Sequence, residues 1–473
     1  MALSPTDLCF LELSEVSQLI RSQAVSAEEV TAAVLRRIDE LNPSLNCYIT
    51  VLHQAAMESA ANLQRELRRG GWRGLLHGVP VSVKDNILTA GIRTTAGSPL
   101  LKEWTPDRNA EVVQRLGSAG AVLIGKTNLM QYAYAAAHPL FGEPRNPHRL
   151  EMTCGGSSSG SAAATAAGMG FGSVGTDTGG SIRIPAAFCG VVGLKPTYGV
   201  VSRRGVIPIS NNLDHVGPIA RTVRDCAIMF GSICGLDEDH FERKYLNELE
   251  RGVLGFRLGV VRLQGQSYVD AEVGTAFDRA CHELVGLGAT LREVEVPDLA
   301  QAQLIMYTLS GVEAAELHRD QFRQQREQYN PALRTRLEIA EFVPAIEYVH
   351  AQRVRQRFRI EVDMLFREVD ALLLPAVGIA AYESGTNRLR FGGGKEEDVA
   401  NVGSRFTALF NLTGHPALVL PCGANEANLP IGLQVVCAPH HEAVLFRVAR
   451  AYEQLNRWYE RRPAGVETAS PGL

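Results

Sequence analysis

The sequence has no group of residues with the spacing of a metal site. Its nine cysteines are scattered, none of them forms a CxxC pair, and the 12 histidines include no HExxH motif. Zinc sites in proteins need cysteines and histidines at such short, regular spacings. An odd number of scattered cysteines is typical of reduced thiols. We therefore expect no metal, no cofactor and no disulfide framework.

Long apolar runs and a strong charge of either sign are also missing. No stretch of 18 apolar residues occurs, and no basic region followed by an apolar run stands at the start. The chain has 47 lysines and arginines against 51 aspartates and glutamates, a net charge of −4. This balance provides no electrostatic attraction to nucleic acid or an anionic membrane. We expect a cytoplasmic protein that binds neither.

Glycine-rich loops that precede a helix and bind phosphate are also missing, although the chain has a stretch rich in small residues. The letter patterns GxGxxG and GxxxxGK[ST] occur at 170–175 and 120–127, but each coincides with a predicted strand and not with a loop that opens a helix. Nearly every residue of 155–181 is glycine, alanine, serine or threonine. The stretch could be a flexible linker, an anion-binding loop, or a hydrolase site with backbone donors beside a nucleophilic serine. The helix-favouring run 162–167 and the strand-like segment 171–174 argue against a linker, and the position of both motif patterns in predicted strands argues against a phosphate loop.

The same stretch resembles the signature of the amidase signature family of serine hydrolases. The match includes Gly155-Gly156-Ser157-Ser158, the segment GTDTGGSIR at 175–183, and the segments 185–190 and 193–197. Upstream, GVPVSVKD at 78–85 matches too. The serines at 157 and 181 are 24 residues apart, as in the family. The resemblance covers nearly the whole chain.

The resemblance implies an α/β fold, a single large domain with a central mixed, mostly parallel β-sheet covered by helices on both faces. The strand–helix–strand order over 77–125 also favours a parallel sheet with covering helices. We expect an N-terminal helical segment, residues 1–70, packed on the core. The amidase signature domain would then span residues 71–462, and residues 463–473 would form a frayed tail.

Several local patterns predict individual elements. Ser26 and Glu29 have the spacing of a capping box at the start of a helix. The apolar strand 77–83 would deliver Lys84 to the carboxyl end of the sheet, where sites of open α/β sheets lie. We also predict one long helical region at 300–359, a mobile loop at 379–398 that contains Gly392, Gly393 and Gly394, and strands at 371–375, 417–421 and 431–436, the last two joined like a hairpin.

Hydrolysis of an amide needs a nucleophile, a base, an acid for the departing amine, and donors for the oxyanion. The resemblance implies Ser181 as nucleophile, Ser157 as a bridging serine that follows a cis peptide bond, and Lys84 as base. A lysine acts as a base only when its pKa falls well below about 10.4, which burial can achieve. In the family the oxyanion is held by consecutive backbone N–H groups, here those of Thr178, Gly179, Gly180 and Ser181.

Other polar residues of the signature are expected to support the structure. We predict that Asp177 and Arg183 form an ion pair that braces the loop of Ser181. Ser158, Ser159 and Ser161 are expected to cap or pack a helix and not to catalyse.

Two positions depart from the family pattern and bear on the substrate. Gln131 stands where the family usually has glutamate, which removes a charge beside the expected pocket mouth. We take Met130, Gln131 and Tyr132 as substrate contacts in an adaptable, apolar wall, with core packing as the alternative. Ile184 stands where glutamine-using subunits of transfer-RNA amidotransferases often have glutamine.

These features predict hydrolysis of a C–N bond in an uncharged, partly apolar amide, anilide or carbamate (urethane) by a monomer or homodimer. The alternative enzyme is the glutamine-hydrolysing A-type subunit of a transfer-RNA-dependent amidotransferase, which would need further protein partners. A non-catalytic scaffold is a third possibility. The presence of Lys84, Ser157 and Ser181 together argues against a scaffold, which has no need of all three.

Overall fold

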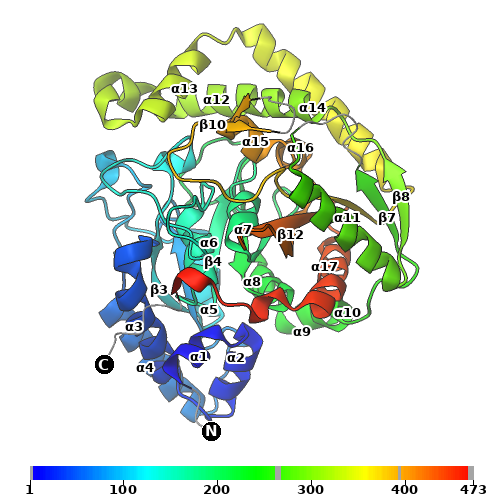
Figure 1. Cartoon of the computed structure of the whole chain (residues 1–473). Coiled ribbons are helices and arrows are strands. Elements are labelled where there is room, and N and C mark those ends of the chain that lie inside the picture. The colour runs from blue at the N-terminus through cyan, green and yellow to red at the C-terminus, as the bar shows by residue number, and fades with distance from the viewer. Residues whose placement is uncertain (1–3, 262–267, 392–395, 467–473) are drawn as a thin grey trace.

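One large sheet runs through the molecule, as Figure 1 shows for the computed structural model, which describes residues 4–261, 268–391 and 396–466. In chain order its strands are β1 (Tyr48–Val51), β2 (Pro80–Lys84), β3 (Val122–Thr127), β4 (Gly172–Asp177), β5 (Val192–Lys195), β6 (His215–Ala220), β7 (Arg257–Val261), β8 (Thr290–Val294), β9 (Ala371–Pro375), β12 (Ala417–Ala424) and β13 (Pro430–Val436). In space their order is β1-β3-β2-β4-β6-β5-β12-β13-β9-β7-β8. A separate ribbon consists of β10 (Arg388–Arg390) and β11 (Glu396–Asp398).

The sheet is mixed, as the sequence predicts, but the expectation that it is mostly parallel is wrong. Parallel pairing joins β2 to β3 and β4 on one side, and β7 to β8 and β9 on the other. The six other pairings between described strands of this sheet are antiparallel. The strand–helix–strand order also holds in the middle, where α7 (Arg183–Cys189) connects β4 to β5, but β6 lies between these two strands and pairs antiparallel with both. The short hairpin between β12 and β13 makes these two strands antiparallel as well.

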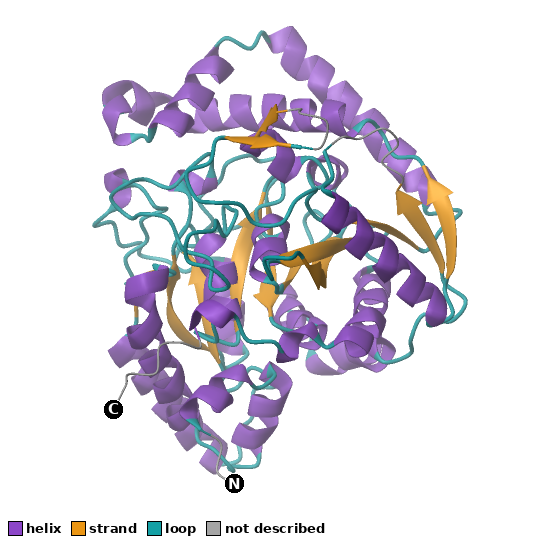
Figure 2. Cartoon of the chain, in the orientation of Figure 1, coloured by secondary structure: helices purple, strands orange, loops and turns teal. Residues whose placement is uncertain are grey.

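Helices flank the sheet, and Figure 2 shows most of its strands in the interior with helices around them, while β8 lies at the edge. In chain order these are α1 (Pro5–Phe10), α2 (Leu13–Arg21), α3 (Ala27–Leu45), α4 (His53–Arg68), α5 (Glu111–Ser118), α6 (Ser159–Ala166), α7 (Arg183–Cys189), α8 (Val223–Cys234), α9 (Glu238–Phe241), α10 (Asn247–Leu249), α11 (Ala271–Gly286), α12 (Leu299–Gln324), α13 (Pro331–Glu341), α14 (Ala345–Leu365), α15 (Val399–Ser404), α16 (Ala408–Thr413) and α17 (Glu442–Asn456). The region 300–359 is therefore three helices and not one.

The N-terminal segment packs on this body and also contributes to the sheet. The Ser26 hydroxyl accepts from the Glu29 N–H at 3.1 Å, and the Glu29 carboxylate accepts from the Ser26 N–H at 2.7 Å. The predicted capping box at the start of α3 is confirmed. Strand β1 lies within residues 1–70 and pairs antiparallel with β3, so this segment is not purely helical. At the other end, residues 467–473 of the predicted frayed tail lie outside the described residues, and Val466 is buried.

Helix α6 explains why so many consecutive residues are small. All eight of its residues, SGSAAATA, are buried, because the helix is enclosed by β4, α7 and neighbouring segments. A Cβ atom on Gly160 would lie 2.4 Å from the Cys47 carbonyl oxygen, closer than any side chain allows. This close packing fixes the start of α6, and the serines just before it, against the carboxyl end of β2.

The helices α12, α13 and α14 form a layer at the top of Figure 1. The ribbon of β10 and β11 lies between this layer and the sheet. It occupies part of the predicted loop 379–398, whose glycines 392–394 lie outside the described residues.

Candidate active site

Lys84 is the last residue of β2, and its ammonium group is surrounded by three hydroxyls. Lys84 Nζ lies 2.8 Å from Ser157 Oγ, 2.9 Å from Ser158 Oγ and 2.8 Å from Thr176 Oγ1. Thr176 comes from β4, the parallel neighbour of β2, and the two serines come from the turn that leads into α6. The lysine side chain is completely buried.

This environment changes the protonation of Lys84. Burial lowers the pKa of Lys84 from its ordinary 10.5 to about 7, although the carboxylates of Asp177 and Asp214 act in the opposite direction. Removal from water disfavours the charged form of an amine. A neutral lysine is therefore well populated near neutral pH and able to accept a proton.

Ser157 and Ser181 meet at one cavity of about 540 Å³. The peptide bond between Gly156 and Ser157 is cis, as expected. The two serine-bearing loops are joined by a hydrogen bond from the Ser158 N–H to the Ser181 carbonyl, at 3.1 Å. Within the described residues no group hydrogen-bonds to Ser181 Oγ, so this hydroxyl is available to the cavity.

The backbone before Ser181 presents donors to the same cavity. The N–H groups of Thr178, Gly179 and Ser181 have no hydrogen-bond acceptor among the described residues. The N–H of Gly180 differs, because it donates to Asp177 Oδ1 at 2.8 Å. The expectation that Gly180 shares in an oxyanion hole is therefore corrected. Its role here is steric: its φ is +131°, and a Cβ atom would lie 2.3 Å from Thr407 Oγ1.

Asp177 and Arg183 form an ion pair that supports the loop of Ser181, and neither side chain is exposed. All five N–H donors of Arg183 are used: two on Asp177, and the others on Thr407 O, Gln434 Oε1 and Asn411 Oδ1. Burial alone would raise the pKa of Asp177, but the Arg183 guanidinium and further donors lower the pKa below its ordinary value. The carboxylate stays ionised and fixes the turn.

A family comparison agrees with this geometry. The sequence model of the family described as Amidase matches residues 29–446. The chain belongs to the amidase signature family. Its structural neighbours include other amidases, and it is an amidohydrolase that acts on amides.

Curated relatives of this amidase-family chain carry two different descriptions. One is the A-type subunit of the glutamyl-tRNA(Gln) amidotransferase of Thermosynechococcus vestitus, 36% identical over 94% of this chain and 98% of that protein. Another is the putative amidase AmiD of Mycobacterium tuberculosis, also 36% identical, over 96% of both chains. A crystal structure of an amidase superposes with a TM-score of 0.86 at 34% identity, covering 94% of this chain and all of that one. Overall similarity thus leaves the substrate open.

The predicted substrate contacts are only partly placed at the cavity. Met130 lines it, with its side chain against Gly156. Gln131 does not: it is fully buried, donates to Ser98 and Gln328, and accepts twice from Asn330. Tyr132 is not a lining residue either, since it packs between neighbouring rings in a buried aromatic cluster. The prediction for both is wrong, because their side chains fasten the segment between α12 and α13 to the core.

Sequence patterns missed a charged group in the cavity wall. Arg336, on α13, lies with its guanidinium carbon 5.0 Å from the ring centroids of both Tyr134 and Tyr307. It lines the cavity and forms no ion pair with a carboxylate of the described residues. Nothing near Arg336 in the sequence marks it, because its neighbours come from segments far away in the chain.

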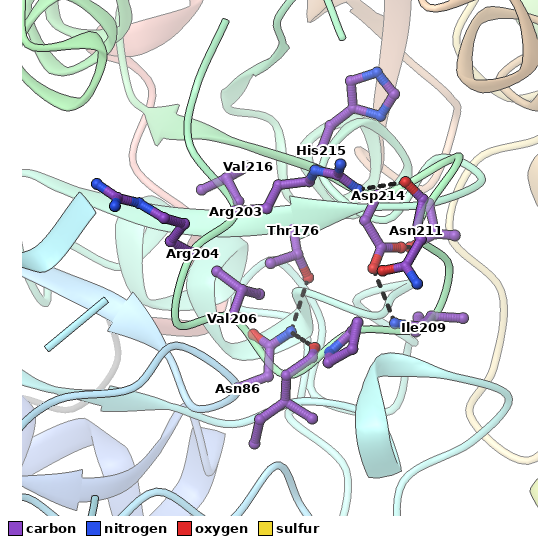
Figure 3. Close-up of a pocket in the computed structure, with 13 residues that line it drawn as sticks. Asn86, Thr176, Arg203, Arg204, Val206, Ile209, Asn211, Asp214, His215 and Val216 are labelled. Carbon is purple, nitrogen blue, oxygen red and sulfur yellow. Dashed lines mark hydrogen bonds between the residues drawn. The ribbon is translucent and has the colours of Figure 1, made fainter. Parts of the chain in front are cut away.

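A second cavity, of about 330 Å³, is shown in Figure 3 and shares lining residues with the first. Thr178 lines both cavities, and its hydroxyl donates to Asp214 Oδ1 at 2.6 Å between them. Asn86 lines the second cavity, and its Nδ2 lies 3.3 Å from Thr176 Oγ1. Thr176 thus separates Lys84 from this second space.

Metal-binding clusters and membrane-crossing helices are both missing from the part of the chain that the structure describes. That part contains no group of three or more histidine, cysteine, aspartate or glutamate side chains arranged to hold a metal ion. Among the same residues no helix has the length and apolarity to cross a membrane.

Proposed function

We propose that this amidohydrolase cleaves the C–N bond of a small amide through a serine acyl-enzyme, with Ser181, Ser157 and Lys84 as a Ser-cisSer-Lys triad. One observation carries the proposal: a fully buried lysine, with its pKa lowered to about 7, lies 2.8 Å from a serine that shares a cavity with Ser181. A solvated surface lysine would have neither property.

The steps follow from these positions. Ser181 loses its proton to Ser157 as Ser157 passes its own to neutral Lys84, and Ser181 Oγ attacks the amide carbon. The free N–H groups of Thr178, Gly179 and Ser181 stabilise the negative oxygen that develops. The C–N bond breaks as Ser157 returns a proton to the departing amine. Water then attacks the acyl-enzyme by the same proton path and releases the acid.

The walls support a partly apolar substrate. Apolar side chains line the cavity on several sides: Met130, Ile184, Phe188 and Met306. We propose aliphatic amides, anilides and carbamates with an uncharged acyl or amine part as the first candidates. The absence of a glutamate at position 131 does not contribute to this choice, because Gln131 is outside the cavity.

A second candidate is favoured by Arg336. A guanidinium that lines the cavity without a carboxylate partner is suited to bind a substrate carboxylate in bidentate fashion. Glutamine offers a carboxylate at the far end from its amide. The alternative is therefore an A-type amidotransferase subunit that releases ammonia from glutamine and works with protein partners. The name of one relative, a glutamyl-tRNA(Gln) amidotransferase, points the same way.

The deciding experiment measures amine or ammonia release from 4-nitroacetanilide, benzamide, a phenyl carbamate and glutamine, with Ser181→Ala as control. Turnover of the neutral compounds, absent in the control, supports the standalone hydrolase. Activity confined to glutamine supports the second candidate. Release that persists in Ser181→Ala would contradict the proposed nucleophile.

A further inference from the structure

The hydroxyl of Ser158 can only accept a hydrogen bond from Lys84. Its own proton is used, because Ser158 Oγ donates to the Thr176 carbonyl at 3.1 Å. Its two lone pairs face Lys84 Nζ at 2.9 Å and the Thr176 N–H at 3.4 Å. A hydroxyl has one proton and two lone pairs, so Ser158 has nothing left to donate.

The hydroxyl of Thr176 is restricted in the same way from the opposite side. Thr176 Oγ1 accepts from Lys84 Nζ at 2.8 Å and from Asn86 Nδ2 at 3.3 Å, the contact drawn in Figure 3. Both lone pairs are occupied, so its proton must point elsewhere and cannot be given to the lysine nitrogen. Asn86 is itself fixed by a second bond, to the Ile207 carbonyl at 3.5 Å.

These two restrictions determine where a neutral lysine points its lone pair. A neutral amine has two N–H donors, and Ser158 and Thr176 can only accept, so each takes one of them. Ser157 is the remaining neighbour, at 2.8 Å, and its hydroxyl proton has no acceptor other than Lys84 among the described contacts. The lone pair therefore faces Ser157.

We propose that Ser158 and Thr176 are positioning residues that direct the lone pair of Lys84 at the hydroxyl of Ser157, so that the base can take a proton only from the serine of the triad. This inference rests on the proposed function of Lys84 as base. It assigns to Ser158 a role beyond capping or packing α6.

The space around Ser158 is built to keep its hydroxyl in place. A Cβ atom on Gly175 would lie 2.9 Å from Ser158 Oγ, so the glycine leaves room for this hydroxyl above β4. Ser158 itself is fully buried. If packing were the only requirement, alanine at 158 and valine at 176 would serve equally well.

Removal of either hydroxyl has two expected effects. The ammonium form loses one of its three acceptors, whereas the neutral form can still place both N–H groups, on the remaining partner and on Ser157. Because a hydrogen bond to a charged group is lost only in the ammonium form, the pH at which the base becomes active should fall by about one unit. The second effect is that the lone pair no longer faces Ser157, so the plateau rate should fall by about tenfold or more.

The test measures the rate at which a fluorophosphonate labels Ser181, as a function of pH. Ser181 Oγ forms a bond to phosphorus, fluoride leaves, and the serine proton passes to the base, so no amide substrate is needed. The variants are Ser158→Ala and Thr176→Val, with Thr176→Ser as the conservative rescue. Ser161→Ala is the matched control. Ser161 is in α6, the helix that follows Ser158, and its buried hydroxyl bonds to Thr127 and does not touch Lys84. Thermal unfolding verifies that each variant is folded.

The expected result is a slower plateau and an acid limb displaced to lower pH in Ser158→Ala and Thr176→Val, with a wild-type limb in Thr176→Ser and Ser161→Ala. Folded variants that keep the wild-type limb and a rate within about twofold would overturn the inference. A slower rate with an unmoved limb would also overturn it, because a loop that is merely displaced lowers the rate without changing the charge of the base. A wild-type protein that is not labelled at Ser181 would overturn the proposed function itself.

Discussion

Arg183 Nε lies 3.0 Å from Asp177 Oδ2, and both side chains are excluded from water. When one partner of such a pair is removed, a buried charge is left uncompensated. Arg183→Met should therefore lower the free energy of unfolding by about 3–5 kcal/mol in a urea titration. Arg292→Met is the control, because the Arg292–Glu368 pair is more than half exposed and should contribute less than about 1 kcal/mol. Equal losses in the two variants would contradict the bracing role of Arg183.

Ser181→Ala should abolish turnover without loss of stability. The hydroxyl has no hydrogen-bond partner among the described residues, so its removal leaves no buried group unsatisfied. We expect kcat to fall by roughly three orders of magnitude or more, with Tm within about 2 °C of the wild type. The measurement is steady-state kinetics beside calorimetry. Substantial residual activity in a folded variant would show that another residue attacks the amide.

The pH dependence should follow Lys84. Burial lowers its pKa to about 7, and only the neutral amine accepts a proton, so kcat/KM should rise as the pH increases through about 7 and then level off. The direction is opposite to that expected for a catalytic group that must be protonated. A rate profile that is flat from about pH 5 to about pH 9 is inconsistent with a lysine base of this kind.

Arg336→Met distinguishes the two candidate substrate classes. If the guanidinium binds a substrate carboxylate, kcat/KM for glutamine should fall by about tenfold or more, because a charge-assisted hydrogen bond is lost. The rate with 4-nitroacetanilide should stay within about threefold, since this substrate has no carboxylate. Arg334→Met is the matched control on the same helix, as Arg334 does not line the cavity. An equal loss for both substrates would show that Arg336 shapes the cavity and does not bind a substrate carboxylate.

Gly180→Ala should damage the site through sterics. The new Cβ would overlap Thr407 Oγ1 at 2.3 Å on a backbone with φ of +131°, so the loop must shift. We expect a loss of about a hundredfold in kcat/KM. Gly274→Ala is the control. Gly274 is in α11, and no other atom lies within 4 Å of the added Cβ, so the free energy of unfolding should rise by about 0.5–1 kcal/mol. Unimpaired activity in Gly180→Ala would show that the loop tolerates displacement.

Much of the site was predictable from local sequence, because its residues belong to contiguous motifs. Lys84 stands at the end of an apolar strand. Ser157 and Ser181 belong to segments of small residues, and such segments are typical of backbone that packs closely against its neighbours. The same holds for the Ser26 capping box and for the hairpin of β12 and β13, which each depend on residues close together in the chain.

Only the tertiary structure decided the features that depend on distant segments. The antiparallel middle of the sheet follows from which strands become neighbours, and strand–helix order alone does not determine this. Gln131 was expected at the pocket mouth, but Asn330, about 200 residues away, satisfies its amide and holds it in the core. Arg336 reaches the cavity only because α13 packs across it.

The chain by itself thus predicted the chemistry that we propose: a base, a bridging serine and a nucleophile, each in a motif of its own. The fold decided how that chemistry is controlled. Burial changes the protonation of Lys84, and Ser158 and Thr176 surround its nitrogen with acceptors. Both effects arise from atoms brought together by β2, β4 and α6, because solvent exclusion and hydrogen-bond direction are properties of packing and not of sequence order.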